Sequence, residues 1–295
     1  SSPYWIGSQT ITFQQMHRQV NACVEYLNTI PLTQPLAMPL AIDSTDPIAL
    51  MAWFWAAART GRCIAIPSTK DPSDIRDHKL SSMNIRIDSL SWTLPIPIPL
   101  HHKDLHKYLH KYPHKDPPSI VTQHTPLCML FTSGSSGTPK VVVHSFSTLW
   151  HSAQFSHNNI AFSHGDRWLQ SLFLWHIGGL MIPIRAVFGG ATVVQKDPFV
   201  SMGDQISRDQ ISHLSMVATQ LDDLLKEDRD LPSLKAVLIG GGSIPSALVS
   251  SAYNQHIPIH TTYGMTELGS QLSTTPPNSD RTTLQSAGSP LGDWM

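Results

Sequence analysis

The sequence predicts an α/β protein built from two wound halves. Apolar residues at helical spacing alternate with short extended segments over residues 1–90, and the same alternation returns from Leu127 onward. A stretch rich in proline and histidine separates the two regions. Alternating helices and strands are typical of parallel βαβ units. With 41% apolar side chains in 295 residues, the chain can build a core, which excludes general disorder.

Two helices are expected in the first half. Thr12 and Gln15 form a capping box ahead of apolar residues that recur at helical spacing. Asp46 and Pro47 suit the start of a second, more apolar helix, and Gly61 suits its end. Short strands are expected at residues 36–42, 62–66 and 84–88.

A connector is expected at residues 91–126. Alternating prolines favour extended backbone there, and the near-repeat HKDL, HKYL, HKYP, HKDP follows them. The repeat spaces four histidines as metal ligands on a helix would be spaced, but each has a lysine beside it, and lysines repel a divalent cation. We therefore interpret the repeat as a solvated linker rather than a metal site. The four histidines are His102, His106, His110 and His114.

Composition excludes several classes of protein. Lys and Arg total 20 against 21 Asp and Glu, so neither nucleic acid nor an anionic membrane is expected as a partner. The three cysteines lie far apart without a CxxC pair, which argues against a disulfide framework and favours a reducing cytoplasm. The longest apolar run, residues 48–58, is too short to cross a bilayer. A soluble cytoplasmic enzyme is expected.

The strongest local signal is the segment TSGSSGTPK at residues 132–140, directly after an apolar strand. Two glycines let backbone N–H groups face an anion, while hydroxyls and one lysine add donors and positive charge, as a polyphosphate requires. It is not a Walker motif, because Lys140 follows Pro139. The alternative is a surface turn rich in serine and glycine. The candidate phosphate ligands are Thr132, Ser133, Gly134, Ser135, Ser136, Gly137, Thr138 and Lys140.

Two later segments add chemistry suited to a nucleotide. A strand runs into Gly240, Gly241 and Gly242, where a flat ring could approach the backbone closely. This is not a Rossmann fingerprint, because Pro245 stands at the third glycine position. Residues 262–267 offer an aromatic face for a base, a hydroxyl for a phosphate and a carboxylate suited to Mg²⁺.

Four segments of the chain, in the order in which they occur, resemble the core motifs of the adenylate-forming enzymes. The superfamily includes acyl-CoA synthetases, luciferases and the adenylation domains of peptide synthetases. The runs LIGGGSIP, YGMTELGSQLSTTPP and SAGSPL are most similar to the 2-succinylbenzoate–CoA ligases of menaquinone biosynthesis. The four segments are TSGSSGTPK (132–140), LFLWHIGGL (172–180), GGGSIP (240–245) and YGMTE (263–267).

The resemblance implies an ATP-dependent acid–thiol ligase. A carboxylate would attack the α-phosphate of ATP, giving an acyl-adenylate and pyrophosphate, and the thiol of coenzyme A would then displace AMP. Such a reaction needs no covalent enzyme nucleophile, so positioning and charge stabilisation carry the catalysis. ATP, Mg²⁺, CoA and a small-molecule carboxylate are the implied ligands, and a homodimer is allowed.

The resemblance also implies roles for single residues. Lys140 and its loop would hold the β- and γ-phosphates, Thr266 would contact the α-phosphate, and Glu267 would bind Mg²⁺. His176 would border the acyl pocket, and the alternative is a core histidine beside Trp175. The adenine and the acyl group would lie against Gly240, Gly241, Gly242, Tyr263, Gly264 and Met265.

Arg185 stands alone in the apolar run 180–188, which is expected to be a helix that lines the pocket. A buried guanidinium is costly unless it is paired, and no acidic residue lies near it in sequence. Arg185 is therefore a candidate to bind the second, non-reacting carboxylate of succinylbenzoate. The alternative is an arginine that extends to water or pairs with a distant acid. Ser270 and Gln271 are further candidates for substrate contacts.

The α/β chain is expected to comprise two wound βα subdomains and the start of a small β-barrel subdomain. The family continues beyond Met295 into a ribose-binding Asp and a mobile C-terminal domain, so the chain is expected to be the large N-terminal domain, with impaired turnover. Two other functions stay open: a ligase for another aryl or fatty acid, and a nucleotide-binding module with little turnover. The expected domain boundaries place a first α/β subdomain at 1–90 and the connector at 91–126. A second α/β subdomain with the phosphate loop follows at 127–262, and the adenine and Mg²⁺ motif with the start of the β-barrel subdomain at 263–295.

Overall fold

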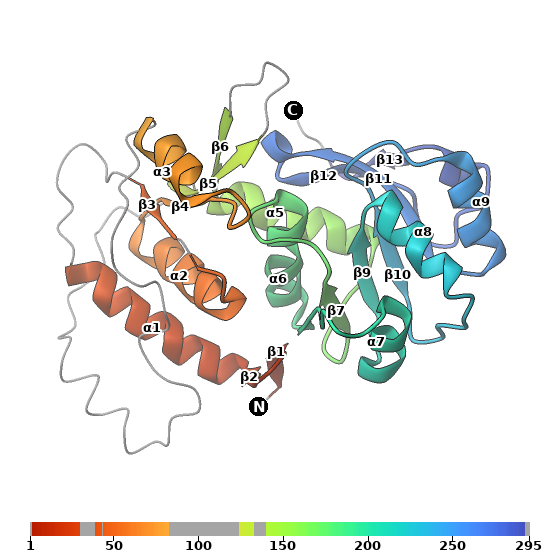
Figure 1. Cartoon of the computed structure of the whole chain (residues 1–295), viewed down its shortest axis with the longest axis horizontal. Coiled ribbons are helices and arrows are strands. Elements are labelled where there is room, and N and C mark those ends of the chain that lie inside the picture. Colours follow the sequence, from red (N-terminus) through yellow and green to blue (C-terminus); the bar gives the residue numbers. More distant parts are fainter. Residues whose placement is uncertain (1, 30–38, 43, 83–123, 133–139, 293–295) are drawn as a thin grey trace. The chain divides into compact units, whose positions relative to one another are not determined.

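A computed structural model of the chain describes residues 2–29, 39–42, 44–82, 124–132 and 140–292 (Figure 1). The chain divides into two compact units. The first covers residues 12–147, and the second covers residues 2–11 and 148–295. The histidine repeat and the strand expected at 84–88 lie outside the described residues.

The helix α1 (Phe13–Thr29) begins where the sequence predicts it. The Thr12 backbone N–H donates to Gln15 Oε1 at 2.9 Å, and the Gln15 N–H donates to Thr12 Oγ1 at 3.1 Å. The predicted capping box is therefore confirmed, and it satisfies two N–H groups that lack partners inside the helix.

The helix α2 (Pro47–Thr60) also has the predicted ends. The Ile48 N–H donates to Asp46 Oδ1 at 2.9 Å, and Gly61 closes the helix with a φ of 67°. That left-handed conformation is accessible to glycine without steric cost, which explains why the helix stops there. α2 is buried on nearly all sides, as its almost wholly apolar sequence requires.

The first unit holds a four-stranded sheet in the order β3-β4-β5-β6. β3, β4 and β5 are parallel, whereas β5 and β6 form an antiparallel pair. β5 and β6, which fall within the expected 127–262 subdomain, join the sheet of the first unit instead. The reason is that β5 pairs with β4, and β6 returns beside β5. The bounds are β3 (Leu40–Ala41), β4 (Ile64–Ile66), β5 (Pro126–Thr132), β6 (Lys140–Ser145) and α3 (Ser73–Ser82).

The second unit holds a nine-stranded sheet in the order β13-β12-β11-β10-β9-β7-β8-β1-β2. Its centre is parallel, and β11, β12 and β13 pair antiparallel at one end. The strands are β1 (Pro3–Ile6), β2 (Thr10–Thr12), β7 (Arg167–Gln170), β8 (Thr192–Gln195), β9 (His213–Met216), β10 (Ala236–Ile239), β11 (Ile259–Met265), β12 (Ser270–Thr274) and β13 (Ser289–Pro290). The helices are α5 (Phe146–Asn159), α6 (Ile177–Gly189), α7 (Met202–Asp209), α8 (Ala218–Lys226), α9 (Ser246–Asn254) and the short turns η1 (Thr266–Leu268) and η2 (Thr283–Gln285).

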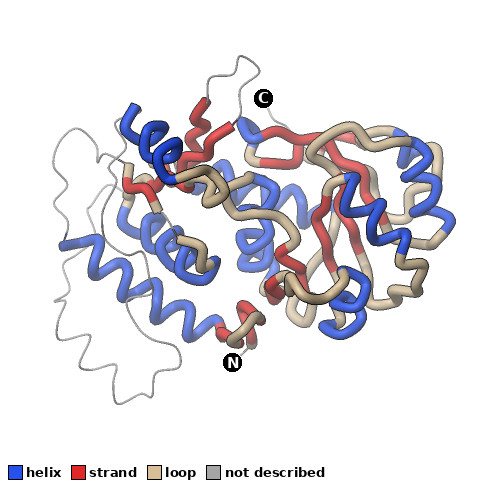
Figure 2. The backbone as a smooth tube through the Cα atoms, in the orientation of Figure 1, coloured by secondary structure: helices blue, strands red, loops and turns tan. Residues whose placement is uncertain are grey.

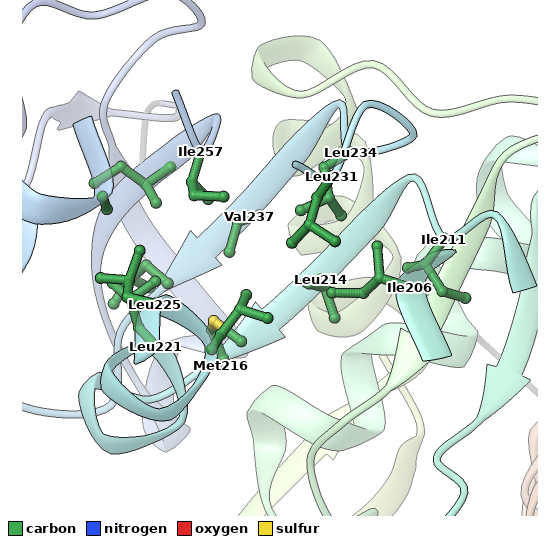
Figure 3. Close-up of a cluster of buried hydrophobic side chains, with 14 of the residues drawn as sticks. Ile206, Ile211, Leu214, Met216, Leu221, Leu225, Leu231, Leu234, Val237 and Ile257 are labelled. Atoms are coloured by element: carbon green, nitrogen blue, oxygen red, sulfur yellow. The ribbon is translucent and has the colours of Figure 1, made fainter. Parts of the chain in front are cut away.

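Helices cover both faces of this sheet: α7, α8 and α9 lie on one side, and α5 and α6 lie on the other (Figure 2). Successive side chains of each strand point to opposite faces of the sheet, as strand geometry requires. Leu214 and Val237 join a core cluster with leucines of α8, which Figure 3 shows. Trp168 instead lies against Arg185 of α6. The mixed α/β architecture with parallel sheets confirms the predicted fold class.

No helix among the described residues is both long enough and apolar enough to span a membrane.

Candidate functional site

A cavity of about 620 Å³ lies in the second unit, at the carboxyl ends of the parallel strands β7, β9, β10 and β11. Ligands of open α/β sheets bind at this edge, because the strand ends and the loops that follow them surround a crevice there. Nine residues singled out from the sequence line the cavity: His176, Arg185, Gly240, Gly241, Gly264, Met265, Thr266, Ser270 and Gln271.

The loop between β7 and α6 forms one wall. Gln170 at the end of β7 holds it, because its side-chain Nε2 donates to the carbonyl oxygens of Leu172 at 2.7 Å and Gly179 at 3.0 Å. Gly179 is required at its position, since a Cβ there would overlap the Phe173 carbonyl. The tight packing brings the half-exposed Phe173 ring to the cavity, stacked 4.3 Å from the ring of Trp175.

His176 is the N-cap residue of α6 and lines the cavity. Its side chain is exposed, so the alternative of a buried core histidine is wrong. The carbonyl oxygen of His176 accepts from the Leu180 N–H at 2.9 Å and begins the helix. The imidazole is therefore attached to a fixed backbone position at the cavity wall.

Arg185 lies two turns further along α6 and is 1% exposed. It does not extend to water, so that alternative is wrong. Its Nη2 donates to Ser270 Oγ at 3.3 Å, its Cζ lies 5.6 Å from the centroid of the Trp168 ring, and its Nε has no hydrogen-bond partner in the part of the chain that the structure describes. Among the described residues, no acidic side chain pairs with this guanidinium.

Burial lowers the pKa of Arg185 to about 9. The cause is the loss of water around the guanidinium, which disfavours the charged form. The group still carries its proton at pH 7. The cavity wall therefore holds a positive charge with an unused N–H donor, and an anion in the cavity would complete its contacts.

The start of α8 forms the opposite wall, and sequence reasoning missed it. The Ser171 hydroxyl donates to the Ser215 carbonyl, and Gln220 bonds both the Val217 N–H at 3.1 Å and the Ser171 carbonyl at 3.1 Å. Ser215 lines the cavity at 5% exposure, and its hydroxyl has no partner among the described residues. A buried hydroxyl without a partner indicates a position that a polar ligand can satisfy.

The hairpin of β11 and β12 closes a third side. The pairing carries a bulge between Tyr263 and Gly264, and a Cβ at Gly264 would overlap the carbonyl oxygen of Ser270. Ser270 has a φ of 103°, an unusual value for a residue with a side chain. The side-chain amide of Gln271 is already engaged, accepting from Ser156 Oγ at 2.7 Å and donating to Thr274 Oγ1 at 2.8 Å.

The glycine segment after β10 approaches its neighbours closely. A Cβ at Gly240 would lie 2.8 Å from Thr262 Cγ2, and Gly241 has a φ of 79°, whereas Gly242 has open space around it. Tyr263 and Glu267 are exposed on β11 and η1, and neither they nor Gly242 line the cavity.

The two described ends of the phosphate loop belong to the first unit. Thr132 and Lys140 are opposite each other in the pairing of β5 with β6, so the two ends of the loop are held together, and Lys140 is exposed. The loop residues Ser133, Gly134, Ser135, Ser136, Gly137 and Thr138 lie outside the described residues.

Solved structures with this fold include o-succinylbenzoate–CoA synthetase (MenE) from Bacillus subtilis. Its complex with ATP and magnesium ion has a TM-score of 0.79 and 26% identity, covering 98% of this chain and 62% of that one. The complex with AMP has a TM-score of 0.78 and 25% identity, covering 98% and 77%. The N-terminal domain of FACL13 from Mycobacterium tuberculosis, at 19% identity, has a TM-score of 0.79 over 97% of this chain and 78% of that chain, and it shows the fold alone.

Similar sequences are named 2-succinylbenzoate–CoA ligase. The 2-succinylbenzoate–CoA ligase of Bacillus velezensis is 37% identical over 60% of this chain and 37% of the relative, and that of Bacillus subtilis is 38% identical over 55% and 34%. The aligned part of the chain thus spans about a third of these relatives. The family described as AMP-binding enzyme matches residues 56–294. Because that match covers most of the chain, the protein belongs to the AMP-binding enzyme family.

Proposed function

We propose that this protein is an ATP-dependent acid–thiol ligase that activates 2-succinylbenzoate for transfer to CoA in menaquinone biosynthesis. In the first step, a carboxylate oxygen bonds to the α-phosphorus of ATP while the bond to the β-phosphate oxygen breaks, releasing pyrophosphate. In the second, the CoA thiolate bonds to the acyl carbon and AMP leaves. The similar proteins named 2-succinylbenzoate–CoA ligase support this choice of substrate.

The single observation that carries the proposal is the buried Arg185 without an acidic partner. Its Nη2 has one long hydrogen bond to Ser270, and its Nε has none among the described residues. Leaving such a cation unpaired is costly, and the cost is recovered when a carboxylate binds. 2-Succinylbenzoate has two carboxylates, of which only one reacts. We assign the other to Arg185, with the unpartnered hydroxyl of Ser215 as a second donor.

The nucleotide would lie along the glycine segment and the β11–β12 hairpin. Gly240 and Gly241 line the cavity, where a flat ring could lie against their backbone, and the exposed Tyr263 ring offers a stacking face for adenine. Thr266 would donate to the α-phosphate. Gly242, Gly264 and Met265 complete the proposed adenine and acyl surface.

Glu267 would hold Mg²⁺. This ion is bound through one or two carboxylates together with substrate phosphates and water, so a single exposed carboxylate beside Thr266 fits it. When bound, Mg²⁺ neutralises charge on the phosphates. Lys140 and its loop would contact the outer phosphates, His176 would border the acyl group, and CoA would be the co-substrate. Gln271 would shape the wall through its backbone, since its amide is already bonded.

The two other functions make different demands on the cavity. A ligase for fatty acids needs an apolar inner wall, and a buried guanidinium in that wall disfavours it. A nucleotide-binding module with little turnover would bind ATP but would release no pyrophosphate when an acid is added.

Substrate-dependent pyrophosphate release tests the proposal. A panel would contain 2-succinylbenzoate, a monocarboxylic analogue that keeps the reacting carboxylate, benzoate and a medium-chain fatty acid. We expect 2-succinylbenzoate to give the highest kcat/KM. Arg185→Ala should lower its binding by about 2–5 kcal/mol and leave ATP binding unchanged, because one half of a desolvated charge pair is removed. Arg208→Ala, at a half-exposed arginine of α7, is the matched control. Equal use of the monocarboxylic analogue would contradict the proposal.

We place the protein in the cytoplasm, since Cys23, Cys63 and Cys128 are all free thiols in the described structure. The homodimer stays a prediction, which sedimentation analysis would test.

A further inference from the structure

The buried charge of Arg185 needs a counterpart while no substrate is bound. Within the described part of the chain, the polar and aromatic contacts of its guanidinium are the hydrogen bond to Ser270 and the ring of Trp168. The bond to Ser270 is long at 3.3 Å and is made by one of the guanidinium nitrogens, Nη2. Trp168 supplies the second of these contacts.

Trp168 offers the face of its ring to this cation. Arg185 Cζ lies 5.6 Å from the ring centroid, inside the about 6 Å over which the electron-rich face of an indole attracts a cation. Both side chains are 1% exposed, so water does not screen the attraction.

Neighbouring rings hold Trp168 in this orientation. Phe162 packs against it edge-on at 5.2 Å between centroids, and His213 lies at 5.2 Å with its ring tilted. Burial lowers the pKa of His213, and its Nδ1 is within hydrogen-bond distance of Ser212 Oγ at 2.8 Å. The imidazole is thus neutral at pH 7 and adds no second positive charge beside the guanidinium.

We propose that Trp168 is a positioning residue that fixes Arg185 through its indole face and makes the cavity selective for an acid with a second carboxylate. An acidic counterpart would cancel the positive charge, and an aliphatic one would leave the cation without support. An aromatic face supports the cation and leaves the charge available to the substrate. The inference rests on the proposed function, in which Arg185 binds the non-reacting carboxylate.

Fluorinated tryptophans test it, because fluorine weakens the electrostatic attraction of the ring face and hardly changes its shape. Mono-, di- and trifluorotryptophan would be introduced at residue 168 alone. Calorimetry would then give the dissociation constants of 2-succinylbenzoate and of the monocarboxylic analogue. We expect the preference for the dicarboxylate to fall stepwise with each fluorine, by about tenfold in total, while the analogue binds unchanged. Trp5 is the matched control, a fully buried tryptophan in β1 of the same sheet whose described ring contact is Tyr4.

Two variants separate this role from packing. Trp168→Phe should keep most of the preference, because phenylalanine retains an aromatic face, and Trp168→Leu should lose it. In an Arg185→Met background, fluorination at residue 168 should have no effect on either acid. A preference that stays constant through the fluorine series would overturn the role of Trp168. Absence of any preference in the unmutated protein would instead overturn the proposed role of Arg185.

Discussion

Replacing Arg185 by methionine should stabilise the substrate-free protein. Burial lowers the pKa of this group from its ordinary value to about 9, and at 1.36 kcal/mol per pH unit the charged form is disfavoured by roughly 5 kcal/mol. The contacts of the guanidinium with the Trp168 ring face and the Ser270 hydroxyl offset about 1–3 kcal/mol of this cost. Methionine is apolar, flexible and similar in length, so it fills the space with little strain. We expect a net gain of about 2–4 kcal/mol in the free energy of unfolding.

Urea unfolding of both proteins at pH 7, without ATP or acid, measures this gain. A second series at pH 10 gives the sign of the proton linkage. The folded-state pKa of Arg185 lies below the unfolded-state value, so between the two the unfolded chain binds more protons and the unmutated protein gains stability as pH rises. The advantage of Arg185→Met should therefore be largest below pH 9 and should shrink above it.

Arg208→Met is the control for the chemistry of the substitution. Arg208 is half exposed and pairs with Asp197 at 3.1 Å and Asp209 at 2.9 Å, so water screens these pairs and the loss of Arg208 should lower stability only slightly. A loss of stability above 1 kcal/mol in Arg185→Met would refute the reasoning, because it would show that the guanidinium is well paired in the folded protein.

Three further outcomes follow from the structure. Lys140→Ala should weaken binding of ATP much more than binding of AMP, because Lys140 is assigned to the outer phosphates; equal losses by calorimetry would contradict that assignment. Gly264→Ala should lower the melting temperature by several degrees, since its Cβ would overlap a β12 carbonyl, whereas Gly242→Ala, with open space, should have little effect. Asp166→Asn should cost about 1–3 kcal/mol at pH 7 and progressively less as the pH falls through the folded-state pKa of Asp166. Burial opposes the charge of Asp166, but the hydrogen bonds from Lys235 at 2.7 Å and from the Ser163 N–H at 2.8 Å together outweigh it and lower its pKa, so the contribution is present above 3.8 and lost below the folded-state value.

The elements that the sequence predicts best are those whose ends carry local signals. α1 begins at the capping box of Thr12 and Gln15, and α2 begins after Asp46 and ends at Gly61. Each of these end contacts joins residues that lie a few positions apart. Such contacts depend on neighbouring residues alone, so sequence spacing identifies them.

β7 and β9 were missed for the opposite reason. Each has four residues, and polar side chains such as Arg167, Gln170 and His213 interrupt the apolar pattern that identifies a buried strand. They are strands because they lie between β8 and β10, a long-range condition that no local pattern contains. Ser171 and Ser215 were missed with them, because each is a single serine that becomes notable only when its strand ends at the cavity.

Arg185 shows where sequence reasoning reaches its limit. A lone cation in an apolar run is visible in the sequence, and so is the problem of its charge. The group that contacts the guanidinium cannot be read from the sequence, because the residues that flank Arg185 are equally compatible with an acidic side chain, water or an aromatic ring. The structure brings Trp168 on β7 against α6 and places Ser270 on β12 at the end of the guanidinium. Neither contact removes the positive charge from the cavity. Under the proposed function, a site built in this way would bind a second carboxylate more tightly than any neutral group, and the charge balance around Arg185 would then decide which acid is selected.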